Sequence, residues 1–232
     1  MYRLTGIKER YSCSDKISNL GNMLVDKPSM ISIIRRVMLG TRVSGLSDPA
    51  REKLIESSVK EAEIMGDIES SEVQSFINKL TEFLDYDLKT DCRPRGTLLE
   101  YITYYAGSLS ISSKNVATLR RCYLTDSAGI RLIDGDCDFD VGFYVPDSQD
   151  CIAEVELLEC KFNLENSLFA KGEIKKSLCT KIRYMESVGV LLKCISSVVA
   201  FVSLADNPKR IERKLQSLGY KHVSVLCWEE AG

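Results

Sequence analysis

The feature that most constrains the fold is a change of residue pattern at residues 91–96, Asp-Cys-Arg-Pro-Arg-Gly. Before this segment, apolar residues recur at about every third or fourth position, the spacing that gathers them on one face of a helix. After it, alternating and continuous apolar runs typical of strands are interspersed with helical ones. We therefore predict a small, mainly helical N-terminal domain over residues 1–92 and an α/β domain over residues 93–232.

The N-terminal part is expected to consist of helices joined by turns. The helices that the apolar spacing predicts cover residues 28–39, 48–66 and 71–86. The second has the clearest start, because Asp48 can cap the helix and Pro49 suits its first turn. Gly40 and Gly66 are expected to end the first two helices.

The C-terminal part alternates helices and strands in an order that favours a sheet flanked by helices. We predict helices over residues 97–107, 169–187 and 207–219, and strand-like runs over residues 116–124, 129–133, 139–145, 151–162, 197–204 and 223–228. A loop of five residues, Pro146 to Asp150, joins two of these strands and predicts that they form an antiparallel hairpin.

Charge and histidine content exclude several classes of protein. The chain has 31 basic and 33 acidic side chains, which excludes a protein that binds nucleic acid through its net charge. A protein with a local basic groove is not excluded. Its single histidine, His222, cannot supply the imidazoles of Ser-His-Asp or Cys-His hydrolases, HNH nucleases or multi-histidine metal sites. We expect His222 to lie at the surface or at a strand end, without a chemical role.

The cysteines and the apolar runs indicate where such a chain resides. Nine cysteines include no CxxC pair, which leaves a zinc ribbon and a thioredoxin-type motif unsupported. No apolar stretch is long enough to span a bilayer, and the N-terminus lacks the apolar region of a secretory signal. We expect a cytoplasmic protein with reduced thiols and no membrane partner.

One of three Glu-x-Lys sequences lies on a predicted strand. Glu159 and Lys161 are two residues apart there and therefore point to the same side. The sequences at 173–175 and 212–214 lie on predicted helices, where residues two apart diverge. Glu159 and Lys161 end a strand face that is otherwise apolar, which indicates a special environment for the two charges.

The neighbouring strand supplies a second carboxylate. In the predicted hairpin Asp140 can stand beside Glu159, and two close carboxylates are stabilised when a divalent cation, Mg²⁺ or Mn²⁺, lies between them. Lys161 could then help to orient or deprotonate a water molecule and balance phosphate charge. Asp136, Asp138 and Glu156 are alternative ligands. The simpler alternative is that these are solvated strand residues, with Lys161 as their salt-bridge partner.

These segments resemble motifs of the PD-(D/E)xK phosphodiesterase superfamily. The resemblance is carried by Asp138-Phe139-Asp140-Val141 and by the run from Glu154 to Lys161, with residues 96–101 and 178–185 similar to the helices on either side. Phe139 stands where the motif has proline. The chain resembles in particular the nuclease domains of CRISPR-ancillary effectors, but its ninety N-terminal, mostly helical residues cannot hold their cyclic-oligoadenylate sensor domain.

The resemblance implies a restriction-endonuclease-like core, a mixed sheet flanked by helices, over residues 96–228. The site residues that it implies are Glu100, Asp140, Glu159 and Lys161 as catalytic groups, with Asp140, Glu159 and Cys160 as metal ligands. Lys181 would be the lysine of the helix that follows the Glu-x-Lys strand.

Basic residues near the Glu-x-Lys strand predict contacts with nucleic acid. Lys175, Lys176, Lys181 and Arg183 belong to a basic stretch over residues 171–183, and a second stretch covers residues 209–214. Tyr101, Tyr104 and Tyr105 either stack on bases or, more simply, belong to the core.

Three hypotheses about function follow, and the sequence leaves them open. The first is a Mg²⁺- or Mn²⁺-dependent endonuclease that acts on DNA or RNA as a monomer or a homodimer, and whose N-terminal helices serve dimerisation or nucleic-acid positioning. The alternative is a non-catalytic nucleic-acid-binding or assembly protein that keeps the nuclease fold. A purely structural protein that binds another protein through its N-terminal helices is a third reading.

Overall fold

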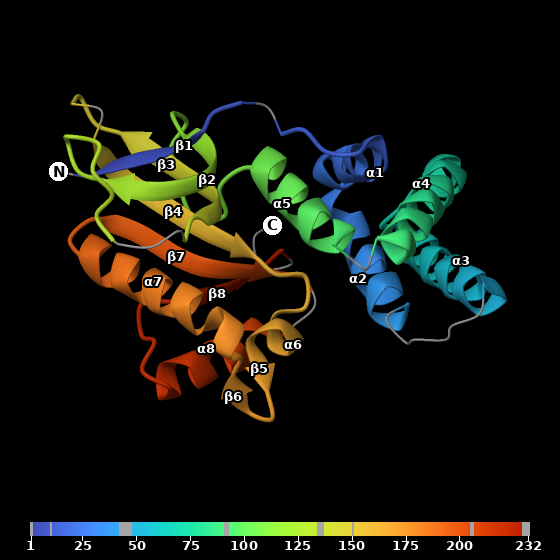
Figure 1. Cartoon of the computed structure of the whole chain (residues 1–232). Helices are drawn as coiled ribbons and strands as arrows, with labels where there is room; N and C mark the ends of the chain where they lie inside the picture. The colour runs from blue at the N-terminus through green and yellow to red at the C-terminus, as the bar shows by residue number, and fades with distance from the viewer. Residues whose placement is uncertain are drawn as a thin grey trace. The chain divides into compact units, whose positions relative to one another are not determined.

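The computed structural model of the chain describes residues 2–9, 11–41, 48–90, 93–133, 137–149, 151–204 and 207–228 (Figure 1). It is an α/β protein that divides into two compact units. Ser12–Ile102 forms a helical unit, and Met1–Tyr11 together with Thr103–Ala231 forms a sheet unit. The predicted boundary was after residue 92, whereas this division falls inside a helix that continues without a break from Pro94 to Ala106.

The helices and strands follow one another along the chain as β1 (Arg3–Ile7), α1 (Asp15–Asp26), the 3-10 helix η1 (Pro28–Met30), α2 (Ile31–Gly40), α3 (Asp48–Met65), α4 (Ser70–Lys89), α5 (Pro94–Ala106), β2 (Ala117–Thr125), β3 (Phe139–Pro146), β4 (Ile152–Cys160), α6 (Leu164–Leu168), β5 (Phe169–Ala170), β6 (Glu173–Ile174), α7 (Lys176–Leu192), β7 (Ser196–Ser203), α8 (Pro208–Ser217) and β8 (Ser224–Cys227).

The helical unit confirms the three helices predicted from apolar spacing, which are α2 with the preceding η1, α3 and α4. Ile34, Phe76 and Phe83 of the predicted apolar faces are fully buried in its interior. Leu20, which is also fully buried, belongs to α1, a helix that was not predicted. Helix α3 begins at Asp48, and Gly66 follows its last residue with a φ of 81°, a conformation that glycine adopts without strain.

The sheet unit contains six strands in the order β1-β2-β3-β4-β7-β8. The adjacent pairs β1–β2, β2–β3 and β3–β4 are antiparallel, whereas the pairs β4–β7 and β7–β8 are parallel. Residues 1–92 were predicted to be mainly helical, and β1 is a strand within this range that was not predicted; it pairs with β2 through Leu4 and Leu124. Strand β1 has five residues and only Leu4 is buried, so its sequence carries little strand periodicity.

Two predicted elements of the C-terminal part differ in the structure. The run 129–133 forms no strand, because only Arg131 makes an isolated bridge, to Thr125. The helix predicted over 169–187 begins only at Lys176, after the β5–β6 hairpin, and extends past Gly189. A Cβ atom at Gly189 would lie 2.5 Å from the Cβ of His222, so the glycine serves close packing rather than helix termination.

Helix α7 covers the sheet face on which the candidate site lies. Its side chains Ile182, Met185 and Val188 join Val155 and Leu157 of β4 in one buried cluster. Figure 1 shows α7 running along the sheet beside β7, with the β5–β6 hairpin and α8 below it in this view. None of the described helices is both long and apolar enough to cross a membrane.

Candidate active site

The predicted hairpin forms and sets the register of the site. Strands β3 and β4 are antiparallel, with Val141 opposite Leu158, so the next positions outward are Asp140 and Glu159. Asp140 Oδ2 accepts a hydrogen bond of 2.7 Å from the backbone N–H of Cys160. The structure therefore brings the two carboxylates that the sequence singled out to adjacent strands at one end of the hairpin.

Two lysines meet Glu159, one at each carboxylate oxygen. Lys161 Nζ lies 2.6 Å from Glu159 Oε1 and 4.0 Å from Asp140 Oδ2. Lys181, which α7 contributes, places its Nζ 2.5 Å from Glu159 Oε2 and also donates to the backbone carbonyl of Asp138. Asp140, Glu159, Lys161 and Lys181 thus form one cluster, which we call the acid–lysine cluster.

Burial and charge in the acid–lysine cluster keep Lys161 protonated. The Glu159 side chain is 6% exposed and that of Lys161 is 27% exposed. Burial lowers the pKa of Lys161, but the attraction of Glu159 and Asp140 outweighs this effect, so the pKa is raised above its usual value. Lys161 is therefore a cation at neutral pH, suited to balancing negative charge rather than to accepting a proton.

Cys160 can take part only through its backbone. Its thiol is buried and lies 3.7 Å from Thr103 Oγ1, on the other side of the strand from the carboxylates. Its carbonyl oxygen, in contrast, is 3.3 Å from Lys161 Nζ and so faces the cluster. The prediction of Cys160 as a metal ligand did not distinguish its thiol from its carbonyl group. In the structure only the carbonyl oxygen faces the cluster, so it is the group of Cys160 that could bind a metal.

The donors that converge are all oxygens, the ligand type of Mg²⁺ and Mn²⁺. They are the carboxylates of Asp140 and Glu159 and the carbonyl of Cys160. Glu159 Oε2 is buried and forms no hydrogen bond of proper geometry, although it is ion-paired with Lys181. No group of three or more His, Cys, Asp or Glu side chains able to hold a metal occurs within the described parts of the chain. The set fits a metal that takes its remaining ligands from water or phosphate.

One of the alternative ligands has a structural role instead. The Glu156 carboxylate is fully buried and accepts hydrogen bonds from Leu109 N–H, Ser110 N–H and the hydroxyls of Ser108 and Ser110. Glu156 is three residues from Glu159, so strand alternation turns it to the other face of the sheet. Asp138 offers its carbonyl to Lys181, and Asp136 lies outside the described residues.

Glu100 belongs to the helical unit and the acid–lysine cluster to the sheet unit. Glu100 is half-buried on α5. Its catalytic role stays a prediction from the resemblance.

The four basic residues predicted to contact nucleic acid divide into two groups. Lys176 and Arg183 are exposed on α7. Lys175 Nζ donates to the carbonyl of Asn166 at 2.5 Å, and Lys181 is held in the acid–lysine cluster. The position of Lys181 on α7, one residue before the buried Ile182, is the sequence signal that it lies at the edge of the packed face.

The tyrosines of α5 also divide. Tyr101 is buried and donates to Asn22 Oδ1 at 2.7 Å, which places it in the core of the helical unit. Tyr104 and Tyr105 are half-buried and pack edge to face, with ring centroids 4.9 Å apart. The core interpretation is therefore right for Tyr101, and the other two keep part of their surface accessible.

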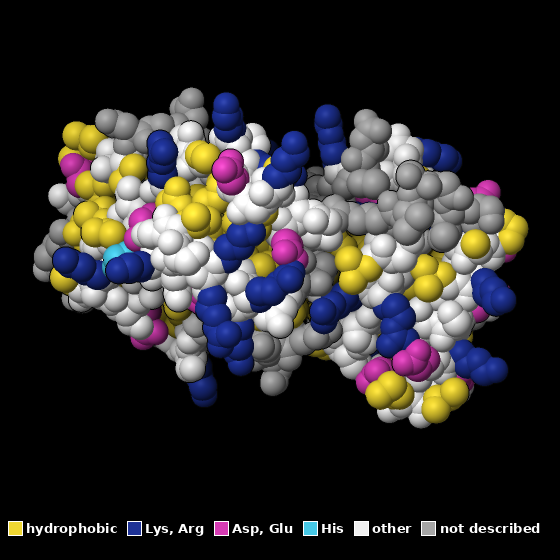
Figure 2. Space-filling model, turned by 90° about the horizontal axis from the view of Figure 1, so that it is seen from below, with side chains coloured by type: hydrophobic (Ala, Val, Ile, Leu, Met, Phe, Trp, Pro, Cys, Tyr) yellow, Lys and Arg dark blue, Asp and Glu magenta, His cyan; other side chains and the backbone are white. Residues whose placement is uncertain are grey.

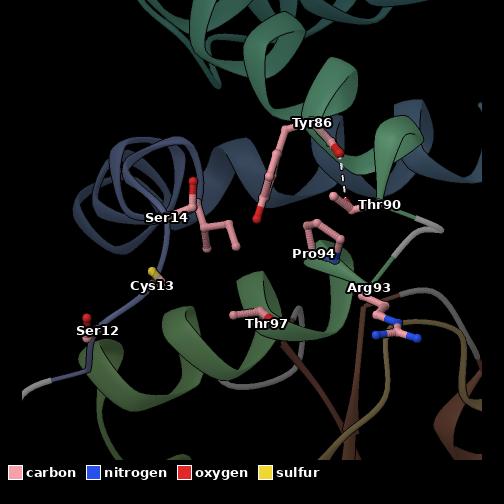
Figure 3. Close-up of a pocket in the computed structure, with 9 residues that line it drawn as sticks. Ser12, Cys13, Ser14, Tyr86, Thr90, Arg93, Pro94 and Thr97 are labelled. Atoms are coloured by element: carbon pink, nitrogen blue, oxygen red, sulfur yellow. Dashed lines mark hydrogen bonds between the residues drawn. The ribbon is translucent and has the colours of Figure 1, made fainter.

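A cavity of about 550 Å³ lies in the helical unit and includes none of the predicted site residues. Figure 3 shows the Tyr86 ring pointing into it between α1 and α5, with Cys13 and Thr97 on its other sides and Arg93 extending away. Thr90, which also lines it, donates its hydroxyl to the Tyr86 carbonyl at 2.8 Å. The residues that line the cavity belong to the helical unit, whereas the acid–lysine cluster belongs to the sheet unit.

Comparison with known proteins gives no further assignment, since neither a protein-family model nor a curated protein sequence matches this chain.

Proposed function

We propose that this protein is a metal-dependent nuclease that hydrolyses phosphodiester bonds of DNA or RNA at the acid–lysine cluster. The observation that carries the proposal is the convergence of Asp140, Glu159 and Lys161 from two adjacent strands, with the side chains of Asp140 and Lys161 still partly accessible beside the buried Glu159. A lone salt bridge needs one acid and one base, whereas this cluster joins two acids and two lysines at the end of an otherwise apolar strand face.

The proposal gives each group of the cluster a task. Asp140, Glu159 and the carbonyl of Cys160 would hold Mg²⁺ or Mn²⁺, and the bound ion would lower the pKa of a water molecule and offset charge on the phosphate. Lys161, a cation at neutral pH, would balance the negative charge that develops on the phosphate. Lys181 would hold Glu159 in position from α7, and Glu100 is proposed to assist from α5.

The chain order of the sheet unit supports the same proposal. Helix α5 is followed by the antiparallel strands β2, β3 and β4, then by α7 and the parallel strand β7. This order resembles the restriction-endonuclease-like core. We also propose that the helical unit serves dimerisation or nucleic-acid positioning, in a cytoplasmic protein.

One observation favours the alternative, a non-catalytic nucleic-acid-binding or assembly protein. Each oxygen of Glu159 already has a lysine within 2.6 Å, so the cluster is neutralised without a metal ion. In that case Lys161 and Lys181 are structural partners of Glu159, and the exposed basic residues alone would contact nucleic acid.

A cleavage assay separates the two functions. The wild-type protein is incubated with single- and double-stranded DNA and RNA in Mg²⁺, Mn²⁺ or EDTA, beside Asp140→Asn and Glu159→Gln. We expect cleavage that requires the metal and disappears in both variants, because each loses a charged ligand. Glu154→Gln, two positions before the buried Glu156 on the same strand, is the control and should cleave like the wild type.

Titration of Mn²⁺ by calorimetry gives an independent reading of the same site. Binding should be measurable for the wild type and lost in Asp140→Asn. Cleavage that persists in Glu159→Gln, or Mn²⁺ binding that Asp140→Asn leaves unchanged, would reject this site.

A further inference from the structure

We infer that the β5–β6 hairpin and helix α8 form a surface that binds the phosphate backbone of nucleic acid beside the acid–lysine cluster. We call residues 169–176 together with α8 the basic surface. The inference deepens the proposed function by naming where the substrate lies, and it rests on that proposal only for the chemical class of the polymer.

Charge is the first observation. The basic surface carries seven cations against two acidic residues, Glu173 and Glu212, in a chain whose net charge is −2. The cations are Lys171, Lys175, Lys176, Lys209, Arg210, Arg213 and Lys214. Figure 2, which looks at the molecule from below, shows Lys and Arg side chains gathered on this face with few acidic ones between them. Such a local excess attracts a polyanion even on a slightly acidic protein.

The second observation is that the segments of the basic surface are held together. Lys214 Nζ lies 3.8 Å from the centre of the Phe169 ring, which joins α8 to the hairpin. Arg210 forms an ion pair with Glu165 of α6, the helix just before the hairpin. These contacts use two of the seven cations to fix the surface, so the hairpin and α8 present their other cations as one unit.

Four of the remaining cations are available to a ligand. Lys171, Lys176, Lys209 and Arg213 are exposed, and none of them forms an ion pair within the part of the chain that the structure describes. Lys171 and Gly172 have φ values of 52° and 88° and form the two-residue turn of the hairpin. A residue with a Cβ is disfavoured at such a φ, yet the turn holds a lysine there and presents it at the tip.

The third observation is the position of the basic surface next to the candidate site. Lys176 begins the helix whose Lys181 contacts Glu159. At a rise of about 1.5 Å per residue, the five steps from Lys176 to Lys181 span roughly 8 Å along the helix axis. Each strand of a duplex carries one phosphate for about every 3.4 Å of its axis. A strand with one phosphate at the cluster therefore has further phosphates within reach of the exposed Lys176.

Binding in EDTA tests the inference apart from catalysis. Fluorescence anisotropy is measured with labelled duplex DNA, single-stranded DNA and single-stranded RNA, over about 50 to 200 mM salt. The variant replaces Lys171, Lys176, Lys209 and Arg213 by glutamine. A matched control replaces four other exposed lysines, Lys53, Lys60, Lys193 and Lys221, so that the change in net charge is the same. Circular dichroism checks that both variants are folded.

We expect the variant, but not the control, to bind more weakly and with a smaller salt dependence. Four lost phosphate contacts should reduce the slope of log K against log salt by about 3 to 4 for duplex DNA, at roughly 0.9 per contact. Equal weakening in both variants would mean attraction to overall charge and would overturn the inference. Wild-type binding to phosphatidylserine vesicles but to none of the oligonucleotides would overturn it as well.

The two proposals fail in different ways. If the wild type shows no cleavage, and the variant nevertheless loses binding in EDTA, the inference about the basic surface is supported and the nuclease proposal is rejected. If Mn²⁺-dependent cleavage is found and all proteins bind alike, the acid–lysine cluster stands and the basic surface is rejected.

Discussion

Each unit of the molecule contains a buried acidic side chain held by a cation, and the two clusters differ in what surrounds them. In the helical unit Arg95 Nε lies 2.6 Å from Asp87 Oδ2, and the two side chains are 2% and 0% exposed. In the sheet unit Glu159 is also buried, at 6%, but its partner Lys161 is 27% exposed.

The hydrogen bonds around these clusters differ in the same direction. Arg95 also donates to the carbonyl of Met38 at 2.7 Å and contacts the Thr41 hydroxyl at 3.4 Å, so its guanidinium joins α2, α4 and α5. Within the part of the chain that the structure describes, the ammonium group of Lys161 contacts Glu159 and the Cys160 carbonyl at the end of its own strand, and Asp140 of the neighbouring strand. The comparison teaches that residue type alone does not distinguish an ion pair that stabilises the fold from one that could act on a ligand. A cation sealed among helices is structural, whereas one at an open strand end can meet a ligand.

The largest effect on folding is expected from breaking the sealed pair. Arg95→Met leaves the Asp87 carboxylate buried without its cation, which should lower the free energy of unfolding by about 3–5 kcal/mol. Urea unfolding followed by circular dichroism measures the change. The double variant Arg95→Met with Asp87→Leu removes the buried charge and should recover much of the loss. A single variant as stable as the wild type would show that the pair is not a structural one.

The open cluster should respond in the opposite way. Lys161→Met is expected to reduce the rate of cleavage by about 100- to 1000-fold, the usual cost of losing one group that stabilises developing charge. The free energy of unfolding should fall by only about 1 kcal/mol, because the amine is partly solvated. Lys53→Met on α3 is the matched control for both measurements. A large loss of stability with unchanged cleavage would show that Lys161 has a structural role like that of Arg95, and would contradict the difference proposed between the two clusters.

A third acid–base pair lies at the surface of the sheet unit, and we expect its loss to have the smallest effect on stability. Glu186 accepts hydrogen bonds from the backbone N–H of His222 at 2.9 Å and from its ring Nδ1 at 2.7 Å. Burial raises the pKa of Glu186, but these hydrogen bonds outweigh it, so the pKa lies below the usual 4.5. The pair therefore stabilises the fold fully above pH 4.5, and this contribution is lost as the pH falls below that value.

Glu186→Gln should remove this part of the acid sensitivity. We expect the drop in unfolding free energy between about pH 5.5 and about pH 3 to be smaller than in the wild type, by less than about 1 kcal/mol. Urea unfolding at a series of pH values gives the comparison. The same pH dependence in both proteins would mean that the hydrogen bonds to His222 do not stabilise the carboxylate.

Much of the site follows from local patterns that the sequence carries in full. The period of two along a strand gives the common side of Glu159 and Lys161, and the short loop before β4 gives the hairpin that brings Asp140 opposite. The start of α3 at Asp48 and the asparagine cap of α8, where Asn207 accepts from the Arg210 N–H at 3.2 Å, were predictable for the same reason.

Other features were not predictable, because they depend on contacts between distant segments. Glu173 and Lys175, expected on a helix, lie on the β5–β6 hairpin and the residue after it. Arg95 lies in the break between the two sequence patterns, where a basic residue would be expected at the surface, yet it is sealed against Asp87. Residues of these types occur both at the surface and in buried ion pairs, and only the packing of distant segments decides which of them are shielded from water.

The sequence by itself determined that two carboxylates and a lysine meet at the end of one hairpin, since strand alternation and a short loop leave the backbone few alternatives. Only the tertiary structure decided that Lys181 joins them and which residues hold Glu156 on the other face. Lys181 reaches Glu159 because α7 packs across the sheet, and Glu156 is satisfied by residues 108–110 on the other face. Both outcomes depend on burial and hydrogen bonds between segments far apart in the chain, which local patterns do not encode.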